Sequence, residues 1–260
     1  MIVARMKACF LRRRNRMEKD EVRKLLYDRY VLTSIRPLVP VNLEGLDSRK
    51  YYFDRIIKEH FPPNKNISIL EIGCGHGAFI HFIKKAGYAN VIGFDNSPDQ
   101  VSESKRLGIT GVFQRDAIEG LRCINTESID LVVAIDVLEH LRKDELFLLA
   151  NEACRVLRRG GKWIIHTPNG ESPFFGRVLY GDLTHETAFT RNSITQLLKS
   201  SGFNTVSVYE DSPVIHGLKS AIRFLLWKIS RTFLRIYIDV ESGESDLCLF
   251  SQNIFSVAKK

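Results

Sequence analysis

The sequence lacks several features that would assign it to particular classes of protein. No stretch approaches the roughly 18 uncharged apolar residues that a bilayer-spanning helix needs, and the N-terminus has no apolar core of a secretory signal. The five cysteines are scattered along the chain, and none belongs to a C-x-x-C pair of the kind that holds zinc or a redox centre. We therefore expect reduced thiols in a soluble, cytoplasmic protein.

Positive charge is concentrated at the start of the chain. The net charge is +8, and the first 24 residues hold nine basic residues against three acidic ones. All three methionines, Met1, Met6 and Met17, lie in this segment, which leaves open that the functional start is internal. We expect residues 1–17 to form a disordered basic arm, and we expect no nucleic-acid partner. A tail that binds phosphate or a membrane is the alternative.

Residues 18–260 have the composition and pattern of one α/β domain. They belong to a chain of 260 residues that is 44% hydrophobic, enough for a well-buried core. A helical cap is expected over residues 18–63 and the main domain over residues 64–260. Within it we expect strands at 67–72, 90–95, 110–114, 129–135, 161–166 and 204–210, and helices at 77–86, 98–107, 143–158 and 191–201. This alternation predicts a doubly wound, mostly parallel sheet with helices on both faces.

A glycine-rich loop follows the first predicted strand. The apolar run that starts at Ile67 ends in Glu71 and is followed by three alternating glycines, which predict a tight turn and a helix start open to a ligand. Gly73, Gly75 and Ala78 fit a loose dinucleotide-binding spacing, but Glu71 would repel a pyrophosphate. A carboxylate there favours a ligand with an ammonium and a sulfonium, such as S-adenosylmethionine. A loop used only for packing is the alternative.

Acidic residues recur at the ends of successive predicted strands. Asp95 closes the second strand, Asp116 follows the third and Asp136 ends the fourth, and Glu71 lies at the end of the first. Each alone is explained as a helix cap. Because ligands of open α/β sheets bind beyond the carboxyl ends of the strands, the four together indicate a ligand site.

These motifs resemble those of class I S-adenosylmethionine-dependent methyltransferases. The resemblance covers residues 65–210 and rests on Glu71-Ile-Gly-Cys-Gly-His-Gly77, Asp95, Asp116-Ala117 and Asp136-Val-Leu-Glu-His-Leu141. It implies a Rossmann-like sheet of seven strands whose last strand, at 253–258, is antiparallel. It also implies that Glu71 and the glycine loop flank the methionyl group, that Asp95 and Asn96 hold the ribose, and that the adenine lies near Asp116 and Ala117. The implied cofactor-binding residues are Glu71, Gly73, Cys74, Gly75, Gly77, Asp95, Asn96, Asp116, Ala117 and Asp136.

Two short segments carry candidate catalytic residues. Methyl transfer to a hydroxyl requires a base, or a metal that acidifies the hydroxyl. His140 is a candidate base oriented by Glu139, or the pair binds a divalent ion of unknown identity; alternatively, they merely begin a helix. His185 lies in a polar loop that ends in Thr190, a predicted helix cap, and is a second candidate. His166 lies inside an apolar strand and is predicted to be a core histidine.

A basic amphipathic helix is predicted as an insertion at residues 216–240. Its apolar residues fall on one side and its basic residues on the other. One interpretation is a helix packed on the core with a solvated basic face. The other is a lid or docking surface for a phosphorylated, lipid-linked or otherwise anionic acceptor, with contact to the inner membrane surface.

The acceptor is suggested only by looser resemblances. The segments around His140 and His185 resemble ubiquinone-pathway O-methyltransferases, whereas the basic helix and the segment after it are similar to methyltransferases that accompany bacterial surface-polysaccharide synthesis. We therefore expect a methyltransferase that acts on a sugar hydroxyl of a surface glycan. A methyltransferase for a small aromatic or quinone-like metabolite, an NAD-dependent oxidoreductase and a cofactor-binding subunit without turnover are the alternatives.

Overall fold

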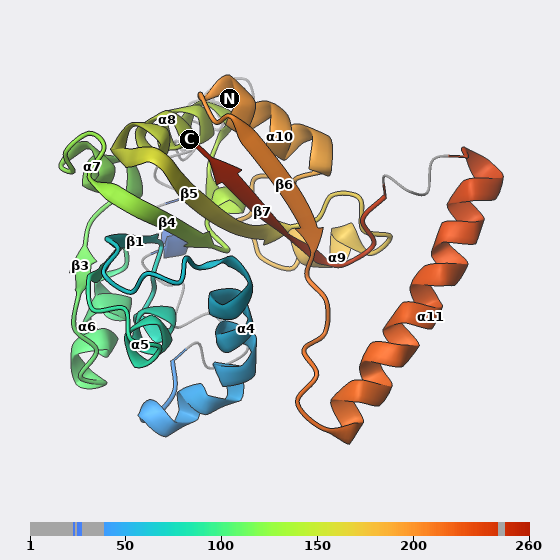
Figure 1. The fold of residues 1–260 in the computed structure, drawn as a ribbon, viewed down its shortest axis with the longest axis horizontal. Coiled ribbons are helices and arrows are strands. Elements are labelled where there is room, and N and C mark those ends of the chain that lie inside the picture. The colour runs from blue at the N-terminus through green and yellow to red at the C-terminus, as the bar shows by residue number, and fades with distance from the viewer. Residues whose placement is uncertain (1–22, 24, 28–38, 244–247) are drawn as a thin grey trace, which may run out of the picture. The chain divides into compact units, whose positions relative to one another are not determined.

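The computed structural model describes residue 23 and residues 25–27, 39–243 and 248–260 (Figure 1). The chain divides into two compact units, Met1–Leu38 and Val39–Lys260, and the sheet belongs to the second. The predicted basic arm and most of the predicted cap before residue 39 lie outside the described residues.

Seven strands form one sheet in the order β3-β2-β1-β4-β5-β7-β6. Neighbouring strands are parallel except that β7 is antiparallel to both β5 and β6, which confirms the antiparallel last strand. Because the strand order reverses between β1 and β4, the ligand crevice of such a sheet is expected at their carboxyl ends. The strands are β1 (Ile69–Ile72), β2 (Val91–Asp95), β3 (Val112–Gln114), β4 (Ile129–Ile135), β5 (Leu157–Pro168), β6 (Thr205–Glu210) and β7 (Asn253–Lys259).

Helices cover both faces of this sheet (Figure 1). In the described chain from residue 39 on, the α-helices are α4 (Lys50–His60), α5 (Ala78–Lys85), α6 (Pro98–Arg106), α7 (Ala117–Arg122), α8 (Lys143–Val156), α9 (Phe175–Leu179), α10 (Arg191–Ser200) and α11 (Leu218–Glu241). Two 3-10 helices are η1 (Leu43–Arg49) and η2 (Leu138–His140).

Alternate strand residues supply two separate hydrophobic cores. Leu70 and Val132 pack with α7, α8 and α10 on one face, whereas Ile69 and Leu131 pack with α4 and α5 on the other. This is the two-residue period of a strand buried on both faces. The doubly wound α/β fold predicted from the sequence is confirmed, and α4 adds its apolar side to one of the cores.

The differences from the predicted boundaries have local causes. Helix α8 ends at Val156 and β5 begins at once with Leu157, which pairs with Ile129 of β4 before the register shifts. The short helices α7 and α9 were not predicted, because neither is long enough to show helical periodicity. Helix α10 begins as predicted: Thr190 Oγ1 accepts from the Ser193 N–H at 3.1 Å, which confirms the cap.

An ionic network around a buried histidine joins α4 to three strands. The ring nitrogens of His166 on β5 lie 2.6 Å from Asp136 Oδ1 and 3.4 Å from Asp211 Oδ2. Asp211, just after β6, also accepts from the Arg55 guanidinium and, at 3.2 Å, from the Tyr52 hydroxyl. Tyr52 and Arg55 belong to α4, so the network fixes this helix against the carboxyl ends of β4, β5 and β6.

The network keeps His166 positively charged. Burial alone would lower the pKa of this histidine, whose side chain is 4% exposed, but Asp136 and Asp211 outweigh burial and raise the pKa to about 10. Burial raises the pKa of both aspartates, and His166 more than reverses this, so that both pKa values lie below the ordinary value. Asp136 is nonetheless 49% exposed, so a ligand can reach it. The predicted core histidine is therefore an ion.

Stability should fall at alkaline pH because of His166. Below its ordinary pKa of 6.5 the histidine is charged in folded and unfolded chains alike, and its stabilisation is complete. Between that pH and about 10, only the folded chain keeps the proton, so the free energy of unfolding falls by at most about 1.4 kcal/mol per pH unit. We expect the wild-type advantage over His166→Gln, measured by urea unfolding, to shrink from pH 7 to pH 10. An advantage that stays constant over this range would contradict the assignment.

Candidate functional site

The loop after β1 needs glycine for two different reasons. Gly73, Gly75 and Gly77 all have positive φ, at 65°, 54° and 82°. A Cβ atom added to Gly73 would lie 2.4 Å from Cγ2 of Val137, so that glycine is required by packing. A Cβ atom on Gly75 would meet nothing closer than 3.6 Å, so the chain itself leaves the space beside Gly75 open. That bare backbone suits close approach by a ligand.

Asp95 connects this loop to the end of β2. Its Oδ2 accepts from the Gly75 N–H at 2.7 Å, and its Oδ1 accepts from the Ser97 N–H at 2.9 Å. Burial raises the pKa of Asp95, and the two backbone donors oppose that rise. Each carboxylate oxygen has a second lone pair, so Asp95 can still accept from a ligand hydroxyl.

Glu71 has a buried carboxyl group, one oxygen of which accepts no hydrogen bond from the described residues. The residue is 4% exposed, and its Oε2 has no hydrogen-bond partner in the described part of the chain. Burial, and then the nearby charge of Asp95, raise its pKa well above the ordinary value, while Arg49 opposes the rise. A cationic ligand group would satisfy this oxygen and favour its ionised form. The carboxyl oxygens of Glu71 and Asp95 therefore fit a ligand with a positively charged end.

Other predicted cofactor residues have more ordinary local roles. Asp116 is exposed, and its Oδ1 caps α7 by accepting from the N–H groups of Ile118 and Glu119 at 2.9 and 3.1 Å. Cys74 is buried, with its pKa raised by burial, and Asn96 lies on the surface. The cap on α7 is the alternative that the sequence had left open for Asp116, and a ligand role for these residues stays a prediction.

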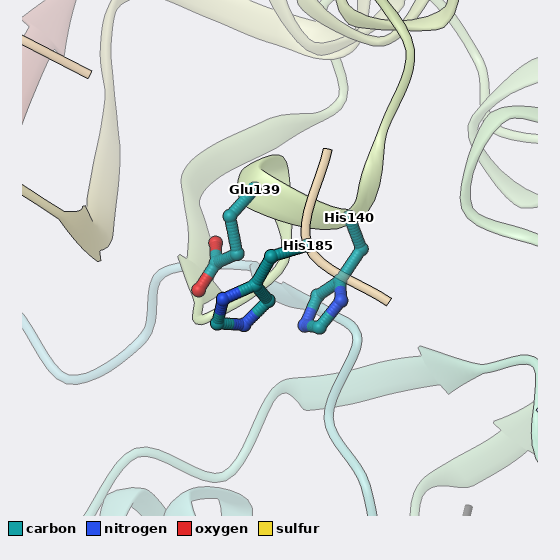
Figure 2. Close-up of side chains that lie close together, drawn as sticks. All are labelled: Glu139, His140 and His185. Atoms are coloured by element: carbon teal, nitrogen blue, oxygen red, sulfur yellow. The ribbon is translucent and has the colours of Figure 1, made fainter. Parts of the chain in front are cut away.

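Three side chains with metal-binding chemistry meet just beyond β4 (Figure 2). Glu139 and His140 come from the 3-10 turn η2, and His185 comes from the loop before α10. Their candidate ligand atoms all lie within 4.8 Å of one another, and the two imidazole centroids are 4.8 Å apart. The structure thus brings together all three residues predicted to be catalytic, although His140 and His185 are 45 residues apart in the chain.

Hydrogen bonds select the tautomers of the two histidines. Thr184 Oγ1 donates to Asp182 Oδ1 at 2.6 Å and therefore accepts from the His140 ring at Nδ1, 2.8 Å away. His185 Nδ1 donates to the carbonyl of Val178 at 3.0 Å. Both rings accordingly carry their lone pair on Nε2, the atom that accepts a proton or binds a metal.

Burial shifts the pKa values of two members of this cluster, Glu139 and His140. Burial, and then the charge of Asp136, raise the pKa of Glu139 to about 8, and its Oε2 accepts from the Thr167 hydroxyl at 3.2 Å. Burial, and then His185, lower the pKa of His140. At neutral pH the cluster therefore offers a neutral imidazole and a carboxyl group that a cation would ionise.

Sequence reasoning missed the residues that orient the cluster. Thr184 holds the His140 ring, whereas Glu139 had been predicted to do so. Asp182 in turn fixes Thr184, because its Oδ1 also accepts from the Thr184 backbone N–H at 2.9 Å. The only signal was the Asp-x-Thr-His spacing at residues 182–185, which is typical of a short turn closed by an aspartate.

Several known proteins are similar to this chain. A family model described as a methyltransferase domain matches residues 46–208. The "Probable S-adenosylmethionine-dependent methyltransferase" of Mycolicibacterium smegmatis is 29% identical over 178 residues, which span 67% of this chain and 66% of that protein. A Mycobacterium tuberculosis protein with the same description is 29% identical over 64% of this chain and 60% of its own length. The chain thus spans less than two thirds of the length of these relatives.

Solved structures show the same fold at low sequence identity. A SAM-dependent methyltransferase from Archaeoglobus fulgidus matches with a TM-score of 0.60 and 21% identity, over 91% of this chain and 99% of that one. Phosphoethanolamine N-methyltransferase 2 of Haemonchus contortus, in complex with S-adenosyl-L-methionine, matches with a TM-score of 0.57 and 20% identity. That match covers 95% of this chain and 58% of the Haemonchus chain.

Proposed function

Because the chain belongs to the methyltransferase domain family, we propose that it is an S-adenosylmethionine-dependent O-methyltransferase. The proposed acceptor is a sugar hydroxyl of a surface-glycan precursor or polymer. The observation that carries the proposal is the cluster of Glu139, His140 and His185, which lies just beyond β4, the strand paired with the Glu71 strand β1. A site for a weakly acidic hydroxyl needs such groups, whereas transfer to a more acidic phenol depends on them less.

The residues at the glycine loop fit S-adenosylmethionine. When bound, this cofactor supplies a methyl group activated by the positive charge on its sulfur. Glu71 provides a buried carboxyl group whose Oε2 lacks a partner among the described residues, which a cationic ligand satisfies. Gly75 leaves its backbone bare, and Asp95 has carboxylate lone pairs left for hydroxyl groups. The role of the protein is to hold and orient the cofactor and to exclude water from the site. This alignment lowers the barrier to methyl transfer.

Two roles are open to the cluster, and both use the same atoms. Nε2 of His140 or His185 accepts the proton that the acceptor hydroxyl loses as the new bond forms. Alternatively, Glu139, His140 and His185 hold a divalent cation, which would acidify the hydroxyl. The threonine and carbonyl that hold the Nδ1 atoms match the hydrogen-bonding arrangement behind histidine metal ligands.

Replacement of Gly75 should impair cofactor binding more than folding. Gly75→Ala places a side chain in the space open to the ligand, and its positive φ costs about 1–2 kcal/mol of stability. Gly108→Ala is the matched control, since Gly108 has a φ of 72° and a Cβ atom there would meet nothing within 4 Å. We expect similar losses in thermal stability but severely weakened S-adenosylmethionine binding, by calorimetry, in Gly75→Ala alone. Equal affinity in the two variants would refute the loop as the cofactor site.

Removal of a cluster histidine should abolish most of the activity. In assays on a panel of nucleotide sugars and phenols, we expect His140→Ala and His185→Ala to lose about 10²–10⁴-fold in turnover on sugars and less on phenols. His81→Ala on α5 is the control, with wild-type turnover. Loss of sugar methylation with a chelator, restored by a divalent ion, identifies the metal role; losses in the variants without chelator sensitivity identify the base.

Wild-type turnover in both His140→Ala and His185→Ala would exclude the cluster from the reaction. Methylation of phenols alone would instead favour a small aromatic acceptor over a glycan.

A further inference from the structure

The outer side of α11 is a long apolar surface that the rest of the described chain leaves exposed. Nine large apolar side chains of this helix are between 45% and 85% exposed. We call them the α11 apolar face: Leu218, Ile222, Leu225, Leu226, Ile229, Phe233, Ile236, Tyr237 and Val240. Contiguous exposed apolar surface of this extent marks an interaction site in a protein that folds on its own. The interpretation of α11 as a helix packed on the core by its apolar side is therefore wrong.

Helix α11 is held to the domain by its opposite side. Ser220 is buried there, and Trp227, Arg231 and Leu234 are only partly exposed. Arg231 forms an ion pair with Glu210 at the end of β6, and its guanidinium lies 4.4 Å from the centre of the Trp227 ring. In Figure 1, α11 lies beyond the β6 edge of the sheet, apart from the helices that cover its faces. The contacts to the domain thus leave the α11 apolar face turned outward.

Basic residues border this face on both sides. At 100° per residue, Lys219 and Arg223 fall along one margin of the apolar stripe, and Lys228 and Arg235 along the other. The sequence has no aspartate or glutamate from residue 212 to residue 238. The helix as a whole carries five basic residues against two acidic ones, both near its end.

We propose that α11 docks the protein on an anionic lipid surface, with its apolar face in the boundary between headgroups and acyl chains. An apolar stripe between rows of lysine and arginine, whose long side chains reach the headgroups, is the pattern of a helix that lies in a membrane interface. No helix among the described residues is long and apolar enough to cross a membrane. A second copy of α11 packed antiparallel on this face across a two-fold axis would instead place Lys228, at the middle of the helix and on the margin of the face, near its own counterpart. The charge thus favours the lipid.

Co-sedimentation of the full chain with lipid vesicles tests this proposal. Vesicles of phosphatidylcholine alone are compared with vesicles that contain about one third phosphatidylglycerol. We expect the wild type to bind the anionic vesicles and to bind the neutral ones at least about tenfold more weakly. Phe233→Ser should lower the affinity for anionic vesicles about thirtyfold by removing a buried phenyl group. Joint replacement of Lys228 and Arg235 by glutamine should cause a similar loss on anionic vesicles only.

A control variant separates α11 from the basic arm and from general surface effects. Phe147→Ser removes an equally large side chain that is 46% exposed on α8, and it should bind vesicles as the wild type does. The first 24 residues also carry positive charge. If Phe233→Ser and Phe147→Ser bind vesicles equally well, the basic arm and not α11 accounts for the binding, and the proposal is overturned. A wild-type dimer in light scattering that Phe233→Ser makes monomeric, without vesicle binding, would also overturn it, since a second copy would then cover the face.

Discussion

A network of alternating charges around a buried histidine fixes the arrangement of the elements at the carboxyl ends of β4, β5 and β6. His166 lies between Asp136 and Asp211, and Arg55 completes the series. Removing one of its three largely buried members, His166, Asp211 or Arg55, leaves a neighbouring charge uncompensated, which typically costs about 3–5 kcal/mol. Because the four residues follow or belong to β4, β5, β6 and α4, one network fixes the position of α4 and the direction in which the chain leaves β4. The turn that carries Glu139 and His140 starts only two residues after Asp136.

The acidic residues at the carboxyl ends of the strands differ in whether a positively charged protein group balances their charge. Asp136 and Asp211 meet protein cations, so the protein itself stabilises their charge. Glu71 is buried, yet the charges that act on it are a repulsive aspartate and an exposed arginine, and one of its oxygens is without a partner among the described residues. A buried polar group left unsatisfied lowers stability, and a ligand that satisfies it recovers that free energy as affinity. The contrast separates acids that build the fold from the acid that is available to a cationic ligand.

The sequence was sufficient to predict the features that depend on local residue pattern and on the order of the strands. The strands that place Glu71, Asp95 and Asp136 at or next to their carboxyl ends were predicted, and topology alone brings those ends together. Hydrogen-bond partners distant in sequence were not predictable: His166 looked like a core residue because its charge depends on Asp211, 45 residues away. Asp116 shows a different limit of sequence reasoning. It too is an aspartate at a strand end, but in the structure it caps a helix. Side-chain identity at a strand end indicates where a group lies, but its partners determine what it does.

Helix α11 shows why periodicity alone cannot assign a surface. The helical wheel placed most of the apolar residues on one side, but a core, a second chain and a lipid interface all select that pattern. What distinguishes them is the side of the helix that the domain holds. Here the domain holds the side with Ser220, Trp227 and Arg231, and the apolar stripe faces away from it. Leaving that stripe in water costs free energy along its whole length, so α11 is expected to persist in this form only if its apolar side meets something other than water.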